Sequence, residues 1–381
     1  MPKRGGDTTD MSTLKILHAA DLHLDSPFEA LGASKAALRR GEQRELLGRI
    51  ADLAIEEKVD LVLFAGDLLD SDNTFYETGE ELVRSLRRIG APVFIAPGNH
   101  DYYSERSPYA RLKLPENIHV FTSREISCFT LKELGVRVYG AAFTDRRSEG
   151  LLQGFHAPRG DGFVNLLCLH GEVGVRDSAY NPISEEELAL SGIDYAALGH
   201  VHRESELRRA GSTAYAWPGC PEGRGFDETG EKHVYLVRLE GGRCEIDKRC
   251  VASRRYEILE TDVSGVEPLL AIHTQLPDET VRDIYRIVLR GEVDAPPDLR
   301  RLQENLSEFF FELQLRDETH LRRDIWDKAG EDSLRGLFLL KLRARYDAAA
   351  SERERAHIEQ AARWGLAAID NREEVLRHDD P

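Results

Sequence analysis

The sequence lacks the features that would assign it to several special classes of protein. Its five cysteines include no CxxC pair, so we expect reduced thiols rather than a disulfide framework or a zinc knuckle. No apolar run is long enough to cross a membrane. The first ten residues, MPKRGGDTTD, contain no apolar core of the kind found in signal peptides. These absences predict a cytoplasmic protein without membrane contact.

Basic side chains are also fewer than acidic ones. The chain of 381 residues has 51 Lys and Arg against 68 Asp and Glu, a net charge of −17. Such a charge repels the phosphate backbone at long range and argues against indiscriminate nucleic-acid binding. It does not exclude a DNA substrate, because bound metal ions and a local arginine patch reverse the field at a site. With 41% hydrophobic and 31% charged residues, the composition is that of a globular protein with two or three domains.

Apolar runs and helical patterns alternate in the first hundred residues. The runs LKILHAAD, VDLVLFAGD and APVFIAPGNHD predict three buried strands. Between them, residues 41–58 and 77–89 have the apolar spacing of amphipathic helices. This order predicts parallel strands joined by right-handed crossovers.

After Tyr102 strand-like runs follow one another closely. They are HVFTSR, CFTLKELGVRVYGAAF, NLLCLHGEV, DYAALGHVH and STAYAWPGC, then a hairpin in KHVYLVRLEGGRCEIDKRCV with its turn at Gly-Gly. A short helix is expected at 183–191. We therefore predict an α/β fold in which a second sheet packs on the first, giving a two-sheet sandwich with flanking helices.

The pattern changes again near residue 254. Two strands with a helix between them, then a helix and a further strand, predict a smaller α/β domain. Two charged amphipathic helices follow it. We expect a disordered leader at 1–12, a main domain at 13–254, the smaller domain at 255–330 and a C-terminal helical segment at 331–381.

Seven side chains of metal-binding type stand at the ends of the buried runs. They are Asp21, His23, Asp67, Asn99, His170, His200 and His202. Because ligands of α/β sheets bind at the carboxyl ends of strands, neighbouring strands would bring all seven to one rim. Mixed nitrogen and oxygen donors suit Mn, Fe or Zn better than Ca. Two divalent ions, with Mg also possible, would clamp a phosphoryl group.

Three of these positions have particular expected roles. If the chain stays extended after its strand, Asp21 and His23 lie on one face. Asp67 at a strand end is placed to bridge two cations. His100 is expected to be the general acid or to stabilise the transition state, with its imidazole held by a carboxylate, Asp101 or Asp21.

Each motif has an ordinary alternative when it is taken alone. DxH and HxH patterns have a high false-positive rate, GNHD fits a turn with a left-handed Asn, and His170 fits a buried core histidine. Together these alternatives require five unrelated placements of metal-type residues, each after an apolar run. The metal cluster is therefore the favoured interpretation.

The motifs DLH, GD, GNHD, H and GHVH, in this order, resemble those of the calcineurin-like metallophosphoesterases over about residues 14–250. Within that superfamily the chain resembles the SbcD-type nucleases. The segments ADLHLDSPF and PGCPEGRGFDETGEKHVYLV are most similar to the YhaO-type DNA repair exonucleases.

The resemblance implies a division of the ligands between two ions, with manganese as the usual activator. Asp21, His23, Asp67 and His202 would hold one ion; Asp67, Asn99, His170 and His200 would hold the other. It also implies that His100 acts on the phosphate, that residues 255–330 form a cap controlling DNA access, and that the final helices dock on an SMC-like ATPase of the SbcC or Rad-fifty type. A homodimer is expected.

Two other functions stay open at this point. The same metal core serves phosphodiesterases and phosphatases acting on small or protein substrates, which a narrow pocket would favour over an open groove. A non-catalytic scaffold in a repair complex is disfavoured, because a scaffold does not need seven intact ligands.

Overall fold

The computed structural model of the protein describes residues 13–71, 74–293, 295–321 and 325–369. The predicted leader, 1–12, lies outside these residues, as does 370–381 of the predicted C-terminal segment. Residue contacts divide the chain into two compact units. The first runs to Leu259 and includes Pro277–Ile287 and Glu304–Gln314; the second comprises Glu260–Leu276, Val288–Gln303 and the chain from Leu315.

The first unit contains two six-stranded sheets. One has the order β14-β13-β1-β2-β3-β4, with parallel pairing from β1 to β4 and antiparallel pairing of β13 with β1 and β14. Its strands are β1 (Leu14–Ala19), β2 (Leu61–Phe64), β3 (Val93–Ile95), β4 (Ile118–Val120), β13 (His233–Glu240) and β14 (Arg243–Cys250). The turn between β13 and β14 has positive φ at Gly241 and Gly242, as expected for a glycine hairpin.

The second sheet has the order β11-β12-β10-β7-β6-β5. Strands β6, β7, β10 and β12 pair in parallel, and β5 and β11 pair antiparallel at the two edges. The strands are β5 (Ser127–Leu131), β6 (Val136–Gly140), β7 (Val164–His170), β10 (Tyr195–Gly199), β11 (Arg208–Ala210) and β12 (Thr213–Ala216). Two short strands that pair with each other, β8 (Glu172–Val173) and β9 (Pro182–Ile183), follow β7.

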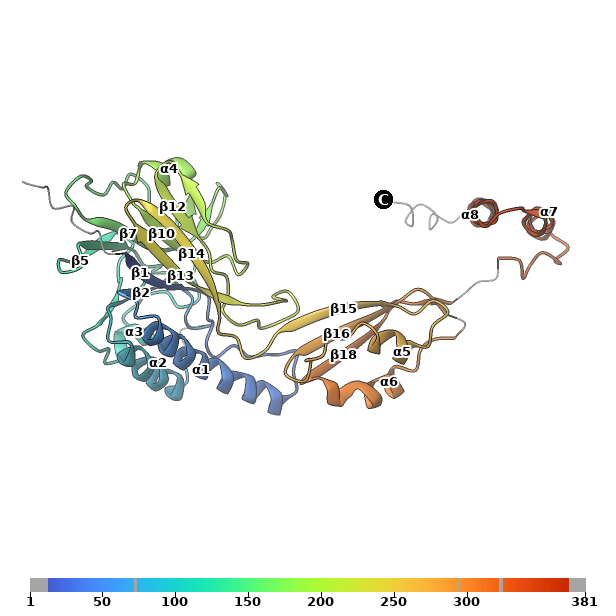
Figure 1. Ribbon diagram of the computed structural model, residues 1–381, viewed down its shortest axis with the longest axis horizontal. Coiled ribbons are helices and arrows are strands. Elements are labelled where there is room, and N and C mark those ends of the chain that lie inside the picture. The colour runs from blue at the N-terminus through green and yellow to red at the C-terminus, as the bar shows by residue number, and fades with distance from the viewer. Residues whose placement is uncertain (1–12, 72–73, 294, 322–324, 370–381) are drawn as a thin grey trace, which may run out of the picture. The chain divides into compact units, whose positions relative to one another are not determined.

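The central strands are apolar throughout because both of their faces are buried. Ile16 and Phe94 of the first sheet pack against Leu166 of the second in a core between the sheets. On the outer face of the first sheet, α1 (Ala33–Glu56) and α2 (Tyr76–Ile89) supply a second core. The short α3 (Pro108–Arg111) follows on this side, and α4 (Glu185–Leu190) covers the second sheet (Figure 1). The predicted two-sheet α/β sandwich with flanking helices is confirmed.

The elements after residue 254 follow the predicted order. Strands β15 (Tyr256–Asp262), β16 (Ile284–Arg290) and β18 (Glu312–Asp317) form a three-stranded sheet, and β17 (Glu292–Val293) pairs with β19 (His320–Leu321). The helices are α5 (Pro268–His273) and α6 (Leu299–Leu306), the latter continued by a 3₁₀ turn at Ser307–Phe309. The division into compact units cuts through these strands, so a domain boundary near 254 stays a prediction.

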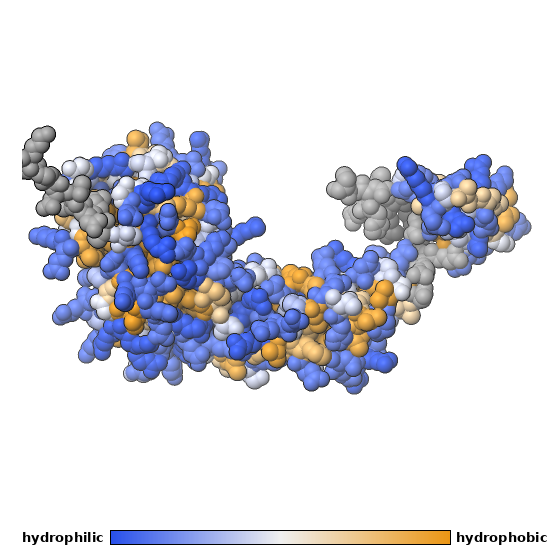
Figure 2. Space-filling model, viewed as in Figure 1, coloured by the Kyte–Doolittle hydropathy of each residue, from blue (hydrophilic) through white to orange (hydrophobic). Residues whose placement is uncertain are grey.

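Two helices, α7 (Leu334–Ala348) and α8 (Glu352–Ile369), complete the described chain. They share a small core built on Trp326, Leu339 and Ala362. Hydrophobic residues are visible on this pair in Figure 2, and its exposed large hydrophobic side chains include Leu334 and Trp364. Among the described residues, no helix has the length and apolar character needed to span a membrane.

Candidate metal centre

Five parallel strands, three from the first sheet and two from the second, end at a common rim. The loops after β1, β2 and β3 carry Asp21, Asp67 and Asn99, while the end of β7 and the loop after β10 carry His170 and His200. Because the two sheets pack face to face, the donors of one sheet meet those of the other. The structure brings all seven predicted ligand residues together.

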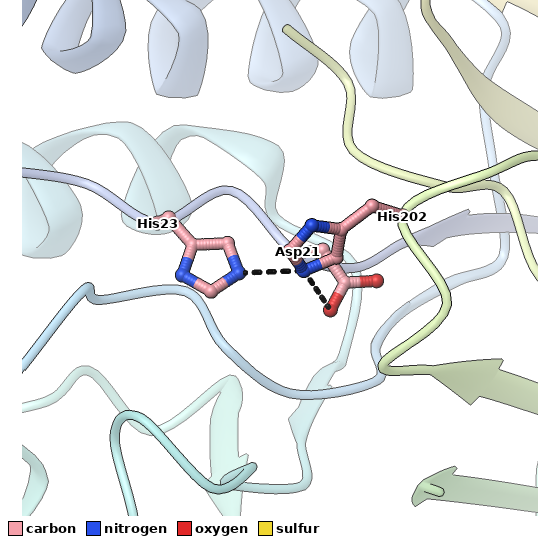
Figure 3. Close-up of side chains that lie close together, drawn as sticks. All are labelled: Asp21, His23 and His202. Carbon is pink, nitrogen blue, oxygen red and sulfur yellow. Dashed lines mark hydrogen bonds and ion pairs between the residues drawn. The ribbon is translucent and has the colours of Figure 1, made fainter. Parts of the chain in front are cut away.

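The donors form two clusters that share Asp67. In the first, His23 Nε2 lies 3.1 Å from His202 Nε2, and His202 Nε2 lies 4.0 Å from Asp21 Oδ1 (Figure 3). His23 Nε2 also lies 3.7 Å from Asp67 Oδ2. In the second, His170 Nε2 lies 2.9 Å from Asn99 Oδ1 and 3.3 Å from Asp67 Oδ2.

His200 completes the second cluster, with its Nδ1 3.2 Å from Asn99 Oδ1. Its backbone N–H donates to both oxygens of Asp21, at 3.0 and 3.1 Å. Asp21 thereby touches the chain segments of both clusters.

The hydrogen-bond partners of the rings fit clusters that hold positive charge. His170 Nδ1 is 2.9 Å from the Ala65 carbonyl oxygen, which only accepts, so this nitrogen carries the proton. Its Nε2 lies among the oxygens of Asn99 and Asp67, which only accept. Positive charge, from a proton on Nε2 or from a metal ion in its place, therefore belongs between these atoms.

The same reasoning applies to the first cluster. His23 Nδ1 is 3.2 Å from Asp70 Oδ1, and His202 Nδ1 is 2.8 Å from Glu228 Oε1. Arg224 Nη2 also lies 3.1 Å from His202 Nδ1. With the protons on the Nδ1 atoms, as the two carboxylates favour, the two Nε2 atoms face each other at 3.1 Å. Imidazoles oriented in this way by carboxylates are typical of metal ligands. The Asp and His clusters therefore fit a dinuclear metal site.

The titration of the buried groups agrees with a site shaped for positive charge. Burial raises the pKa of Asp21 to about 6, because the carboxylate loses solvation. For Asp67 burial acts in the same direction, but His170 outweighs it and holds the pKa well below the ordinary value. Burial lowers the pKa of His170, yet the charge of Asp67 prevails and raises it to about 9. Buried carboxylates thus hold positive charge at this point.

The backbone at three of the predicted ligands is not extended. Asp21, His23 and Asp67 have φ values of 55°, 44° and 51°, in the left-handed region that costs a non-glycine residue about 1–3 kcal/mol. The expected strand-like alternation of Asp21 and His23 is therefore wrong. The two side chains converge because the N–H groups of both residues donate to the β2 loop, at Gly66 O (3.0 Å) and Asp67 O (2.9 Å).

Close packing at the strand ends requires glycine. A Cβ atom on Gly199 would lie 1.9 Å from the Ala65 carbonyl oxygen, and one on Gly98 would lie 2.3 Å from Asp67 Oδ1. The GD, GNH and GHVH motifs therefore place a glycine where the loop of one strand touches the loop of another.

His100 lies at the rim of the centre. Its backbone N–H donates to Asp67 Oδ1 at 2.9 Å, its Nδ1 is 3.1 Å from the carbonyl oxygen of Asp70, and its side chain is 43% exposed. Its ring meets that of His23 edge-on, with centroids 4.7 Å apart. A nitrogen of His100 also lies within 4.8 Å of donor atoms of His23 and Asp67.

The predicted pairing of Asp101 with His100 is not formed. Asp101 is fully buried and accepts from the backbone N–H groups of Gly98, Asp67, Leu68 and Leu69 and from the Tyr109 hydroxyl. The carboxylate nearest His100 is that of Asp70, with Oδ1 3.9 Å from Nδ1. Asp101 thus ties together the loops after β2 and β3.

Comparison with known proteins decides the family. The model of the calcineurin-like phosphoesterases matches residues 14–204, the stretch that supplies every residue of the two clusters. The chain belongs to the calcineurin-like phosphoesterase family. Phosphoester hydrolysis is therefore its class of reaction.

Several curated relatives of this metallophosphoesterase are similar over most of its length. The uncharacterized metallophosphoesterase YhaO of Bacillus subtilis is 28% identical over 83% of this chain and 81% of its own. The DNA double-strand break repair protein Mre11 of Saccharolobus solfataricus is 23% identical over 73% of this chain and 76% of its own. One of the subunits of the SbcCD nuclease of Bacillus subtilis is 26% identical over 60% of this chain and 64% of its own.

Three residues of the metallophosphoesterase centre were missed by the sequence-based prediction. Asp70 and Glu228 hold His23 and His202, and Arg224 donates to Glu228 Oε1 at 2.7 Å and lies 3.4 Å from Asp70 Oδ1. Arg224 and Glu228 lie in the PGCPEGRGFDETG segment, which carried part of the family resemblance. The family resemblance of that segment was therefore the signal that could have pointed to these two residues, although the segment contains no pattern typical of metal ligands.

Proposed function

We propose that this metallophosphoesterase holds two divalent ions, manganese being the preferred metal, and hydrolyses phosphodiester bonds of DNA. The observation that carries the proposal is the convergence of imidazole nitrogens and of carboxylate and amide oxygens, 2.9–3.3 Å apart, in two clusters that share Asp67. Such a cluster is unfavourable unless positive charge lies among its atoms, and mixed nitrogen and oxygen donors suit divalent metal ions. We assign Asp21, His23, Asp67 and His202 to one ion and Asp67, Asn99, His170 and His200 to the other.

When bound, two such ions supply the positive charge and the activated water that phosphodiester hydrolysis needs. The chain's own residues fix the donors in place before the substrate arrives. The Ala65 carbonyl, Asp70 and Glu228 each hold one imidazole by its Nδ1. Asp67 reaches both clusters and is the proposed bridge.

His100 is the proposed residue that acts on the phosphate. Its Nδ1 faces the Asp70 carbonyl oxygen, so Nε2 is directed away from that contact, and the ring is exposed beside Asp67. An imidazole in this position donates a hydrogen bond to a phosphoryl oxygen or a proton to the leaving oxygen. Asp101, which lies in the buried network, is proposed to act only by holding the two loops.

The choice of DNA as substrate is supported by the relatives, which are named as a DNA double-strand break repair protein and a nuclease subunit. A small or protein phosphoester is the second candidate, since the same donors serve it. A cytoplasmic role in DNA repair, with residues 255–330 acting as a cap, belongs to this proposal.

Docking on an SMC-like ATPase and formation of a homodimer are further parts of the proposal. Leu334, Leu337 and Leu340 recur at helical spacing on α7 and are 74%, 53% and 54% exposed. An apolar stripe of this kind suits a partner helix. If Leu337→Asp and Arg343→Asp, a control at an exposed cation of the same helix, bind the ATPase equally well, this surface is not the contact.

One assay separates the substrate classes. The full chain is incubated with Mn²⁺, Mg²⁺, Zn²⁺ or Fe²⁺ and given linear single-stranded DNA, linear duplex DNA or a small aryl phosphodiester. We expect Mn²⁺-dependent cleavage of DNA that is lost in Asp67→Asn and reduced by orders of magnitude in His100→Ala. His156→Ala, an exposed histidine away from the clusters, serves as the control. Hydrolysis of the aryl ester without DNA cleavage under any of the four metals would sink the nuclease proposal.

A further inference from the structure

The buried face of α1 changes character along the helix. From Leu46 to Ala54 its buried side chains are apolar, but the two buried positions just before them are Arg39 and Gln43. Both are fully buried, and their spacing of four positions places them on one face of the helix. A helix face turned to the core is ordinarily apolar, and an arginine is rarely buried unless it is paired. This polar pair therefore has a role other than filling the core.

Gln43 holds the backbone on both sides of His23. Its amide NH₂ group donates to the carbonyl oxygens of Leu22, at 3.3 Å, and of His23, at 3.0 Å. The N–H groups of the same two peptide groups belong to His23 and Leu24, and both donate to carbonyl oxygens of the β2 loop. Because a peptide group is planar, each is fixed at both ends. These bonds hold His23 in its left-handed conformation, with φ at 44°.

The amide oxygen of Gln43 shows that the side chain does more than stabilise the fold. This oxygen is buried, and among the described residues it has no hydrogen-bond partner. A buried acceptor without a donor costs free energy, so an apolar side chain of the same length would pack at least as well. Such a side chain cannot donate to the two carbonyl oxygens beside His23. The donors are therefore the part of Gln43 that matters.

Arg39 holds the segment that orients His202. Its guanidinium donates to the carbonyl oxygen of Gly223 at 3.3 Å. The peptide group that contains this oxygen also contains the N–H of Arg224, which donates to Glu228 Oε2 at 2.8 Å. Glu228 Oε1 in turn lies 2.8 Å from His202 Nδ1. One planar peptide group thus connects Arg39 to the carboxylate that orients His202.

Both connections lead to the first cluster. His23 and His202 face each other there through their Nε2 atoms, 3.1 Å apart (Figure 3). The histidines of the second cluster have other supports, since His170 Nδ1 lies 2.9 Å from a carbonyl oxygen of the β2 loop and His200 Nε2 lies 3.4 Å from Glu172 Oε1. A change on the buried face of α1 should therefore affect one ion and spare the other.

We propose that Gln43 and Arg39 are positioning residues for the first ion, which place His23 and His202 through backbone groups before the ion arrives. The inference rests on the proposed dinuclear function and specifies what sets the geometry of one of its two sites. Neither residue needs to touch the ion or the substrate. Removal of either set of donors should weaken the first ion selectively.

Binding of Mn²⁺ to the metal-free full chain tests Gln43. Gln43→Met keeps the length of the side chain and removes its donors. The wild type should bind two ions, which are close enough to give a spin-coupled electron paramagnetic resonance spectrum. In the variant we expect one ion to bind about tenfold more weakly, so that the spectrum of an isolated Mn²⁺ appears where the wild type shows the coupled pair. Equal weakening of both ions, or of neither, overturns the proposal.

Asn165→Leu is the matched control. Asn165 is also a buried amide that donates to two carbonyl oxygens, those of Pro158 and Gly192, and its own oxygen lacks a partner within the described chain. It lies near the start of β7, whereas His170 ends that strand. The control variant should bind both ions as the wild type does. If it loses the first ion as Gln43→Met does, the effect is general and the positioning role fails.

Second substitutions identify the ion that is weakened. Asn99→Ala leaves the first cluster intact, so adding Gln43→Met should weaken the ion that remains. His202→Ala leaves the second cluster intact, and there Gln43→Met should change nothing. The reverse pattern would connect Gln43 to the second ion and contradict the proposal.

Arg39 is tested by a change that keeps its charge. Its Nη1 lies 2.6 Å from Glu222 Oε1 in a buried ion pair, and an uncharged residue would leave that carboxylate without its partner. Arg39→Lys retains the charge but loses the fork of donors that also reaches Gly223. We expect it to weaken the first ion selectively, whereas Arg137→Lys, at the ion pair with Asp161, should bind like the wild type. Wild-type binding of both ions in Arg39→Lys removes Arg39 from the proposal.

Hydrogen exchange in EDTA measures the positioning without metal. The backbone amides of residues 21–24 should exchange faster in Gln43→Met, and those of residues 222–228 faster in Arg39→Lys. Unchanged exchange in both segments overturns the positioning role, whatever the wild type cleaves. A wild type that binds two ions but cleaves no DNA overturns the nuclease function alone, whereas a wild type that binds no ion overturns both proposals.

Discussion

At the scale of single residues, the centre depends on which ring nitrogen each histidine uses. In His23, His170 and His202 the Nδ1 atom is taken by a carboxylate or a carbonyl oxygen, and Nε2 is turned to the cluster. The orienting partners come from distant parts of the chain. A ligand set that looks local in sequence is therefore fixed by long-range contacts.

Glu228 gives the first test of this dependence. It accepts from His202 Nδ1 and from Arg224 and is 5% exposed. Glu228→Gln keeps the shape but removes the charge, so we expect about 10- to 100-fold weaker metal activation, read as the Mn²⁺ concentration giving half-maximal aryl ester hydrolysis. Glu204→Gln, which removes the carboxylate beside His233, should not shift this midpoint. An unchanged midpoint in Glu228→Gln would contradict the orienting role.

Asp101 gives the second test, because two roles predict different results. If it holds the loops, Asp101→Ala leaves four backbone N–H groups without their acceptor and lowers the free energy of unfolding by about 3 kcal/mol or more. Tyr109→Phe removes one hydrogen bond to it and should cost about 1 kcal/mol. Urea unfolding in EDTA measures both. Lost hydrolysis with unchanged unfolding would instead restore a catalytic role for Asp101.

At the scale of secondary-structure elements, the sequence was informative about strands and poorly informative about loops. The buried runs before Asp21, Asp67, Asn99, His170 and His200 form strands because continuous apolar segments suit a sheet covered on both faces. The backbone conformation and the contacts of the loops could not be predicted from the sequence. The left-handed backbone at Asp21 and His23 depends on bonds to the β2 loop, and Glu228 meets His202 from 26 positions further along the chain.

The contact between the two sheets predicts a pH effect on stability. His18 of β1 is fully buried, with Nδ1 2.9 Å from the Tyr195 hydroxyl and Nε2 3.2 Å from the Leu198 carbonyl oxygen of β10. Burial lowers its pKa from 6.5 to about 3. The unfolded chain therefore binds the proton more readily than the folded one. The stability that neutral His18 contributes to the fold is present above pH 6.5 and is lost as the pH falls toward 3.

This effect is measurable as a difference between variants. Below pH 6.5 the His18 contribution should cost about 1.4 kcal/mol per pH unit. In His18→Gln, which does not titrate, urea unfolding between pH 6 and pH 4 in EDTA should show a pH dependence shallower by this amount. His156→Gln, at an exposed histidine, should follow the wild type. Parallel curves for wild type and His18→Gln would show that His18 does not contribute.

At the scale of the whole molecule, the centre joins the two sheets of the first unit. Asp21, Asp67 and Asn99 belong to loops of one sheet, whereas His170 and His200 belong to the other. Ions held by both sets would cross-link the sandwich only when it is folded, since the donors are far apart in sequence. Metal binding is therefore expected to add to the stability of the fold.

The stabilisation expected from metal binding has a defined size. A ligand that binds only the folded state stabilises it by about 2.7 kcal/mol at a hundred times its dissociation constant, so the midpoint of thermal unfolding should rise steadily with Mn²⁺. Ca²⁺, which prefers all-oxygen sites, should have little effect, and Asn99→Ala should blunt the Mn²⁺ response because it removes the oxygen that faces His170 and His200. A midpoint that does not change with Mn²⁺ in the wild type would show that the two clusters of nitrogen and oxygen atoms between the sheets do not hold ions.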